Sequence, residues 1–346
     1  MITSLGFVLP STSAANRQSK AELSYRIHSD LLITVSDALL AISVIFWAMG
    51  VNGIDVSIIG GFGLVPLLPV VYLLAIVFLV ISAAMLLSAP EPSTKRLAFH
   101  VAALLLMLYG TAPLVYAEPR YAWLYKQIGV VQYIKLHGNL NSSIDIYQNW
   151  PGYFGLAAWF DRVAGINNPL TYAAWAQLFF ETLFCLVIKY VVRAKALALT
   201  WREQWLTVFI FAGANWIAQD YLSPQAFGFV LSMGVFALAL HGLESTHSYQ
   251  LFQKIRSRFS NHSPSALMTE TGSHRDSAPR SGPPISIVSD AEVLIGLLLV
   301  YSVLVVVHEL SPYIVAIQIA VLAFMRRLRR WWIAPAMMAI AIGYLV

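Results

Sequence analysis

Two short polar segments interrupt a very apolar chain, and each carries residues that could bind or activate a substrate. The first runs from Gln219 to Gln225 and the second from His308 to Tyr313, and each places a carboxylate shortly before a Leu-Ser-Pro step. Ser is a favourable helix N-cap, and Pro suits the first helical position because no intrahelical bond needs its missing N–H. We therefore expect two tight turns, which we call the first and second Ser-Pro turns, with Ser223 and Ser311 capping the helices that follow.

The first Ser-Pro turn and the residues before it could bind sugar hydroxyls. If the preceding helix continues this far, Trp216 shares a face with Asp220, and Asn215 shares a face with Gln219. Amides and a carboxylate can hydrogen-bond hydroxyl groups, and an indole can stack on a sugar ring. The candidate substrate-binding residues here are Asn215, Trp216, Gln219, Asp220, Ser223 and Gln225. The alternative is a helix-terminal acid that simply reaches water.

The second Ser-Pro turn offers an imidazole, a carboxylate and a hydroxyl, from His308, Glu309 and Ser311. His308 and Glu309 are adjacent, so on a helix their side chains point about 100° apart. They could still act as acid and base or as metal ligands if the helix ends between them. The N–H groups that begin the helices after both Leu-Ser-Pro steps would suit a phosphate. The alternative is an ordinary short turn between two helices.

The composition indicates which elements must position these turns. The 346 residues are 58% hydrophobic and 11% charged, whereas soluble domains carry roughly 25% charged residues. With a mean hydropathy of +0.69, the chain is predicted to be an all-α polytopic transmembrane helix bundle. Cys185 is the single cysteine, which excludes an intramolecular disulfide and a cysteine-based metal site. The net charge of +5 comes from residues that flank apolar runs, so no nucleic-acid partner is expected.

About 20 mostly apolar residues are needed to cross a bilayer as a helix. The apolar runs predict about nine spans, at residues 31–49, 64–88, 98–117, 171–192, 204–221, 224–242, 291–308, 312–325 and 332–346. Of the 22 Lys and Arg residues, the large majority fall in the loops on one side of this alternation. The positive-inside rule therefore places the N-terminus in the cytoplasm. The same orientation puts both Ser-Pro turns on the extracytoplasmic face of the cytoplasmic membrane.

Four parts follow from this pattern. Residues 1–30 are predicted to form a cytoplasmic tail, and residues 31–242 a membrane domain of six spans. Residues 243–290 are rich in Ser, Pro, His and Arg and cannot bury enough apolar surface to fold, so a disordered cytoplasmic loop is expected. Residues 291–346 would form a second membrane domain of three spans.

The longest extracytoplasmic loop, residues 118–150, has helical apolar spacing over residues 119–136. An apolar run over residues 151–166 follows and is too short to cross a bilayer. Its Trp and Tyr residues are typical of headgroup level. We therefore expect a juxtamembrane amphipathic helix that lies in the outer interface.

Three stretches carry a resemblance to a known class, namely residues 143–154, 216–226 and 308–313. With the long outer loop and the juxtamembrane helix, the chain resembles the GT-C class of glycosyltransferases, which use polyprenyl-phosphate sugars, and actinobacterial membrane proteins of that general type. The resemblance implies a glycosyltransferase, or a degenerate relative of one, that transfers a polyprenyl-phosphate-linked sugar to an acceptor outside the cytoplasmic membrane. It also implies that Asp145 is catalytic, as a general base or as a ligand of a divalent cation such as Mg²⁺ or Mn²⁺. The alternative for Asp145 is a solvated loop acid or a helix cap.

The alternative function is a non-enzymatic membrane protein, either a transporter or a subunit of cell-envelope assembly. Asp37, Gln177 and Glu181 lie inside predicted spans, where polar groups usually face the bundle interior. They could form part of a transport path or simply pack helices together. Transporters gather such groups near the midplane beside broken helices. The two Ser-Pro turns instead place most polar groups at the outer interface, which favours the enzyme.

Overall fold

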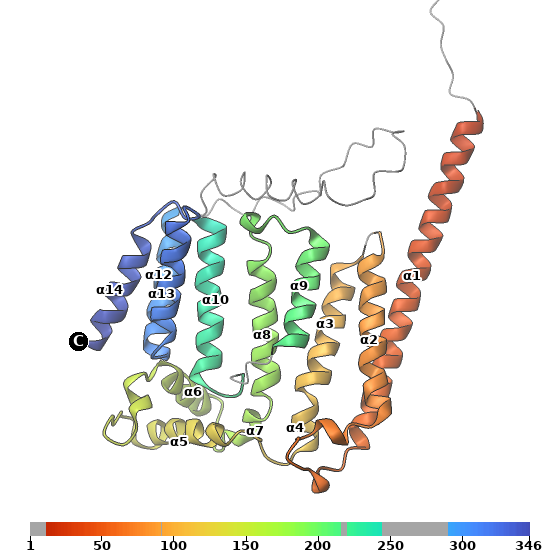
Figure 1. Ribbon diagram of the computed structural model, residues 1–346. Helices are drawn as coiled ribbons and strands as arrows, with labels where there is room; N and C mark the ends of the chain where they lie inside the picture. Colours follow the sequence, from red (N-terminus) through yellow and green to blue (C-terminus); the bar gives the residue numbers. More distant parts are fainter. Residues whose placement is uncertain (1–11, 91, 216–219, 244–289) are drawn as a thin grey trace, which may run out of the picture. The chain divides into compact units, whose positions relative to one another are not determined.

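The computed structural model describes residues 12–90, 92–215, 220–243 and 290–346 (Figure 1). Within these ranges the chain forms helices and turns and no extended strand, which confirms the all-α prediction. The chain divides into two compact units, Met1–Val115 and Tyr116–Val346. The disordered loop predicted for residues 243–290 lies almost entirely outside the described residues.

The first unit contains three long helices and several short ones. They are α1 (Thr12–Asn52), α2 (Val70–Ser88), α3 (Thr94–Tyr109) and α4 (Thr111–Val115), with 3₁₀ turns at Val56–Ile58 and Val65–Leu67. The helix α1 is continuous from Thr12, so it takes in much of the predicted tail together with the first predicted span.

Close backbone approach and hydrogen bonds join α1 to α2. A Cβ atom added to Gly50 would lie 2.8 Å from the Cβ of Tyr72, so a larger residue at this crossing would push the helices apart. Nearby, Ser43 Oγ donates a hydrogen bond to the carbonyl oxygen of Ala75 at 2.6 Å. Small residues and buried hydroxyls of this kind are typical of helix packing in membranes, where the hydrophobic effect cannot hold helices together.

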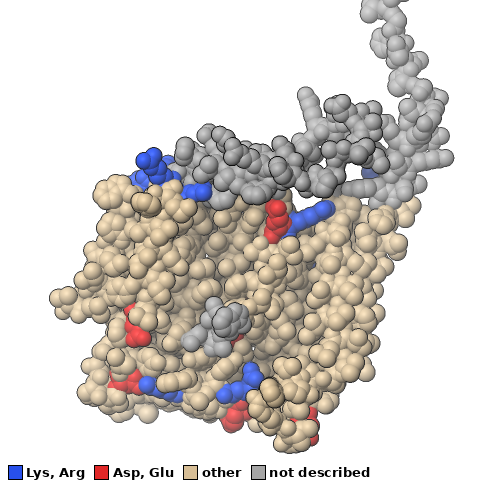
Figure 2. Space-filling model, viewed as in Figure 1, with Lys and Arg blue, Asp and Glu red and all other residues tan. Residues whose placement is uncertain are grey.

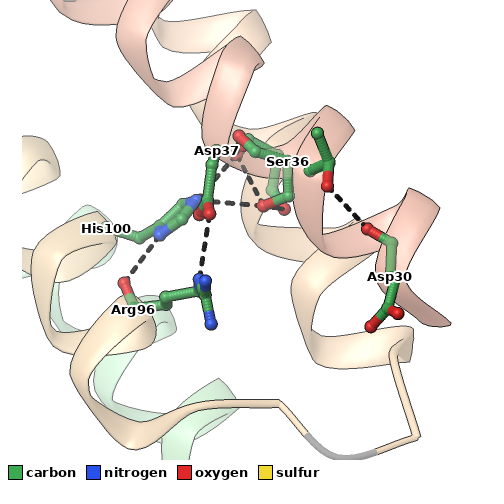
Figure 3. A network of polar contacts seen from close by, with 7 residues as sticks. Asp30, Ser36, Asp37, Arg96 and His100 are labelled. Atoms are coloured by element: carbon green, nitrogen blue, oxygen red, sulfur yellow. Dashed lines mark hydrogen bonds and ion pairs between the residues drawn. The ribbon is translucent and has the colours of Figure 1, made fainter.

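A buried polar network joins all three long helices of the first unit (Figure 3). His100 Nε2 lies 2.7 Å from Ser82 Oγ, and its Nδ1 lies 2.7 Å from the carbonyl oxygen of Arg96. Ser36 Oγ donates to the carbonyl oxygen of Ser82 at 3.0 Å. Asp37 accepts a hydrogen bond from Arg96 Nε at 2.9 Å. This half-exposed ion pair joins α1 to α3 at the edge of the network.

The second unit holds both Ser-Pro turns and the outer loop. Its helices are α5 (Ala122–His137), α6 (Gly152–Val163), α7 (Leu170–Ala173), α8 (Ala176–Val191), α9 (Trp201–Ala214), α10 (Pro224–Gly242), α12 (Asp290–Val307), α13 (Ser311–Phe324) and α14 (Ile333–Leu345), with 3₁₀ turns at Ile146–Asn149 and Lys195–Leu197. The two helices predicted in and after the outer loop are present as α5 and α6. Figure 1 shows α5 and α6 lying across one end of α8, α10 and α12.

Four of the described helices are long and apolar enough to cross a membrane. They are Arg26–Asn52 within α1, and α2, α10 and α12. The other predicted spans correspond to the shorter helices α3, α8, α9, α13 and α14. In Figure 2, Lys and Arg of the second unit gather toward the two ends of its helices, and the face in view is mostly uncharged between them. The chain is therefore an integral membrane protein of the helix-bundle type.

The helix α9 ends earlier than its sequence predicts. It closes at Ala214, and Asn215 follows as a C-cap with extended backbone. Asp220 lies between α9 and α10 and belongs to neither helix. The predicted pairing of Asn215 with Gln219, and of Trp216 with Asp220, on one helix face involves Trp216 and Gln219, which lie outside the described residues. The side chains at this end of α9 are positioned by tertiary contacts.

Candidate functional site

The outer loop and both Ser-Pro turns meet at one end of the second unit. A small recess is lined by Tyr147 and Trp150 from the loop, by Gln225 from the first turn, and by His308 and Glu309 from the second. Close packing at the start of α6 supports this arrangement. A Cβ atom added to Gly152 would lie 3.0 Å from the carbonyl oxygen of Val306 near the end of α12. Residues 143–154, 216–226 and 308–313 are therefore spatial neighbours where they are described.

A cavity of about 290 Å³ lies beside this recess, between α8, α10 and α13. It is lined by Phe184, Asn215, Gln225, Ala226, Phe229, Ser232, Met233, His308, Ser311, Ile314, Val315 and Gln318. Four of the residues predicted to bind substrate contribute to it, namely Asn215, Gln225, His308 and Ser311. Both Ser-Pro turns thus contribute to one cavity.

The cavity has a polar end and an apolar wall. On α10 the lining residues Gln225, Phe229 and Ser232 recur at helical spacing, so one face of that helix borders the cavity. On α13 the same holds for Ser311 and Val315. The polar residues of the turns come first on each helix and large apolar side chains follow one turn later, while Ser232 and Gln318 add two polar groups about two turns in. Such a cavity suits an amphiphilic ligand with hydroxyl or amide groups at one end.

Gln225 offers an uncommitted acceptor at the polar end. Its Oε1 atom is buried and has no hydrogen-bond partner among the described residues. An amide oxygen without a donor in a buried setting loses the free energy of its bond to water, so such atoms usually mark a bound water or ligand. A ligand hydroxyl group could supply the missing donor.

The two Ser-Pro turns begin their helices in different ways. Ser223 is fully buried and caps α10, because its Oγ accepts a hydrogen bond from the Ala226 N–H at 3.2 Å. Ser311 does not cap α13, contrary to the sequence prediction. It is the first residue of that helix, and its N–H donates to His308 Nδ1 at 3.1 Å. One N–H at the start of each helix therefore already has a side-chain acceptor, which leaves fewer N–H groups there for the predicted phosphate.

His308 replaces the expected serine cap of α13. The helix α12 ends at Val307, so His308 and Glu309 both lie in the turn. His308 Nδ1 is also 2.9 Å from Ser311 Oγ. Because Nδ1 accepts the Ser311 N–H, the ring carries its proton on Nε2. Burial lowers the pKa of His308, only partly opposed by the nearby carboxylate of Glu309, and this favours the neutral ring.

A buried polar cluster stands next to the cavity. Gln177 Nε2 donates to Asp220 Oδ2 at 2.7 Å, and Asn215 Nδ2 donates to Glu181 Oε1 at 2.6 Å. The side chains of Glu181 and Asp220 also interact with each other. Asp220 does not line the cavity, whereas Asn215 belongs to both the cluster and the cavity. Asp220 is thus tied to α8 instead of facing headgroups as its position in the sequence suggests.

Asp145 caps a short 3₁₀ turn. Its Oδ1 accepts the Tyr147 N–H at 2.9 Å, as in the helix-cap interpretation. Its Oδ2 lies 3.4 Å from Lys126 Nζ, which stands 4.7 Å from the centre of the Tyr147 ring. Asp145 lines neither the cavity nor the recess, but Tyr147 lines the recess directly. The carboxylate is therefore at the margin of the site, with a cation beside it.

The described residues form no preassembled cluster of metal ligands. Within these ranges no group of three or more His, Cys, Asp or Glu side chains is placed to hold a metal ion. The oxygens of Asp145 already face a backbone N–H and an ammonium group. Mg²⁺ is commonly held by one or two carboxylates together with substrate phosphates, so a role of Asp145 as a metal ligand stays a prediction.

The residues of the two Ser-Pro turns were predicted from the sequence, whereas the contribution of α8 was not. Trp216 and Gln219 lie outside the described residues, and Glu309 lines the recess. The contact of Gln177 and Glu181 with the first Ser-Pro turn was not predicted. Their spacing on one face of α8 was the signal, but only the fold shows which polar residues that face meets.

Known proteins give no further guide to this site. No family model matches the chain, and neither a curated protein nor a solved structure is similar to it.

Proposed function

We propose that this protein is a GT-C-like glycosyltransferase that moves a sugar from a polyprenyl-phosphate donor to an acceptor on the extracytoplasmic side of the cell membrane. The observation that best supports this proposal is the cavity between α8, α10 and α13, with its polar end built from both Ser-Pro turns and its apolar wall. In the donor a phosphate joins the sugar to the isoprenoid chain, so the polar end would take the sugar and the apolar wall the chain.

Different residues of the cavity would contact the two ends of the ligand. Phe229 and Ile314 would contact the isoprenoid chain, since both lie on the apolar wall. Asn215, Gln225 and Ser311 would hydrogen-bond the sugar, because amides and hydroxyls complement sugar hydroxyls in number and direction. The buried Gln225 Oε1 would accept one of these hydroxyl groups. These lining groups carry no formal charge, which suits the sugar better than the phosphate.

The charged groups for transfer would come from the outer loop. Asp145 would take the proton of an acceptor hydroxyl at the margin of the site, and Lys126 beside it would offset the negative charge that develops in transfer. The bond from the acceptor oxygen to the anomeric carbon forms as the bond from that carbon to the phosphate oxygen breaks. The phosphate leaves with the electron pair. Catalysis would rest on positioning and on charge stabilisation of the leaving group.

The decisive experiment uses the full chain in lipid nanodiscs with radiolabelled polyprenyl-phosphate sugars. Asp145→Asn should reduce transfer by about 100-fold or more while donor binding is kept, because the general base is lost. Asp290→Asn is the matched control. Asp290 pairs with Arg329 at 2.8 Å, away from the cavity, and its loss should leave transfer unchanged.

Other outcomes would change the conclusion. Donor binding without transfer in the wild type would indicate a non-enzymatic carrier of lipid-linked sugars. Absence of both would favour the transporter or the envelope-assembly subunit. Transfer that survives Asp145→Asn would keep the enzyme but remove Asp145 as its base.

A further inference from the structure

Two carboxyl groups are buried together beside the cavity, and the proposed sugar transfer uses neither. Glu181 is 0% exposed and Asp220 is 3% exposed. On each carboxyl group, one oxygen accepts a hydrogen bond from an amide, Asn215 for Glu181 and Gln177 for Asp220. The amides hold both carboxyl groups in fixed orientations.

The second oxygen of each carboxyl group has no donor. Glu181 Oε2 and Asp220 Oδ1 are buried and have no hydrogen-bond partner within the described part of the chain. The two side chains interact directly, so each acid is the other's neighbour. A buried acceptor without a donor loses the hydrogen bond that water would give it, so each of these two oxygens destabilises the fold. One proton on either carboxyl group would serve as donor to the other and remove this cost.

We propose that Glu181 and Asp220 bind one exchangeable proton, held between Glu181 Oε2 and Asp220 Oδ1. Two carboxylates in one buried site repel each other, so the pair is favoured with a single negative charge. The proton belongs to the pair and not to one residue. The site is therefore a proton-binding site inside the second unit, separate from the sugar-transfer residues at the outer loop.

The surroundings fit one residual charge. Arg120 acts electrostatically on Asp220 and can balance the charge left on the pair. Tyr121 OH lies 3.3 Å from Gln177 Nε2, and its ring stacks on Tyr221 with centroids 5.2 Å apart. On α8 itself, Cys185 is the titratable neighbour of Glu181. The positive charge of Arg120 can therefore balance the single negative charge of the Glu181–Asp220 pair.

The helices packed against α8 carry their other titratable groups elsewhere. Arg202 and Glu203 are in the first turn of α9, whereas Asn215 and the acid pair are beyond its last turn. His241 is in the last turn of α10, where its ring stacks on Tyr190. These charged and titratable groups are thus a helix length away from the proton site.

Asn215 connects the proton site to the cavity. Its Nδ2 donates to Glu181, and its side chain also lines the cavity. Loss of the proton adds a second negative charge next to this amide, which changes the hydrogen bonding that Asn215 offers to a ligand. Proton binding and ligand binding are therefore expected to be linked, whichever ligand the cavity accepts.

The proton can be observed by infrared difference spectroscopy of the full chain in phosphatidylglycerol nanodiscs. The wild type should show the C=O band of a buried protonated carboxyl group at neutral pH. Glu181→Gln and Asp220→Asn should each remove that band, because the new amide N–H supplies the donor and the remaining acid ionises. Asp290→Asn, an exposed acid paired with Arg329, should leave the band unchanged.

Three results would overturn the proposal. The band could be absent from the wild type, or it could survive in Glu181→Gln or in Asp220→Asn. It could also disappear when sodium replaces choline in the buffer, which would mean that the pair binds a monovalent cation in place of the proton.

Thermal unfolding at different pH values gives a second readout that does not depend on catalysis. A native state that holds a proton its unfolded chain lacks loses stability as pH rises. The wild type should therefore unfold at lower temperature at alkaline pH. Glu181→Gln, which mimics the protonated acid, should flatten this decline, and an unchanged decline would contradict the proposal. Sugar transfer could fail while both readouts succeed, so the two proposals are tested separately.

Discussion

At the scale of single residues, His308 shows how one side chain can organise a turn. Its Nδ1 accepts the N–H of Ser311 while the ring contributes to both the cavity and the adjoining recess. A ring that caps a helix in this way must stay neutral, because a protonated Nδ1 cannot accept a hydrogen bond. The cap of α13 and the polar end of the cavity therefore depend on the same protonation state.

A pH dependence of stability follows from His308. Burial holds its pKa below the ordinary value of 6.5, so the unfolded chain binds this proton more readily than the folded chain. The stabilising contribution is complete above that ordinary value and is lost as pH falls through the folded pKa. His308→Asn keeps a helix cap that does not titrate. Thermal unfolding should show a smaller loss of stability in mild acid for His308→Asn than for the wild type. Equal losses would contradict the capping role.

At the scale of secondary structure, the two Ser-Pro turns look alike in sequence but are built differently. Ser223 is the residue before α10 and caps it with its side chain, whereas Ser311 is already the first residue of α13. The difference arises because α12 ends at Val307, which leaves His308 close enough to receive the first N–H of α13. Equivalent motifs therefore place equivalent serines one residue apart in helix register.

This difference predicts unequal effects of the same substitution. Ser223→Ala should lower the free energy of unfolding by about 1 kcal/mol, since it removes a side-chain cap. Ser311→Ala should have a smaller effect, because His308 Nδ1 still accepts the N–H of residue 311. Denaturant unfolding of both variants in the same detergent measures the difference. A larger loss for Ser311→Ala would mean that its contact with His308 matters more than the cap at Ser223.

At the scale of the whole molecule, the helices of the second unit converge on one end. The outer loop, the start of α10 and the turn between α12 and α13 all contribute to the recess. The predicted orientation places this end outside the cell membrane, with the N-terminus in the cytoplasm. The sugar-transfer proposal requires this orientation, because it places the polyprenyl-phosphate sugar donor on the extracytoplasmic side of the membrane.

Cysteine labelling tests the orientation. In a Cys185→Ser background, Ser142→Cys in the outer loop should react with a membrane-impermeant maleimide on intact cells. Lys195→Cys, in the connection between α8 and α9, should react only after the cells are permeabilised. Both positions are exposed, so burial does not confound the comparison. The reverse labelling pattern would invert the topology and place the cavity's polar end in the cytoplasm.

The sequence by itself determined the class of fold and the polar residues of the turns. Long apolar runs can satisfy their backbone only as helices in a membrane, and Ser, Pro and acidic residues between such runs mark turns. Only the tertiary structure decided the end of α9 at Ala214, the cap at His308 and the pairing of Glu181 with Asp220. Local patterns specify where a helix can form and which face is polar. The packing of distant helices determines which polar side chains meet, because a buried polar group is stable only beside a hydrogen-bond partner.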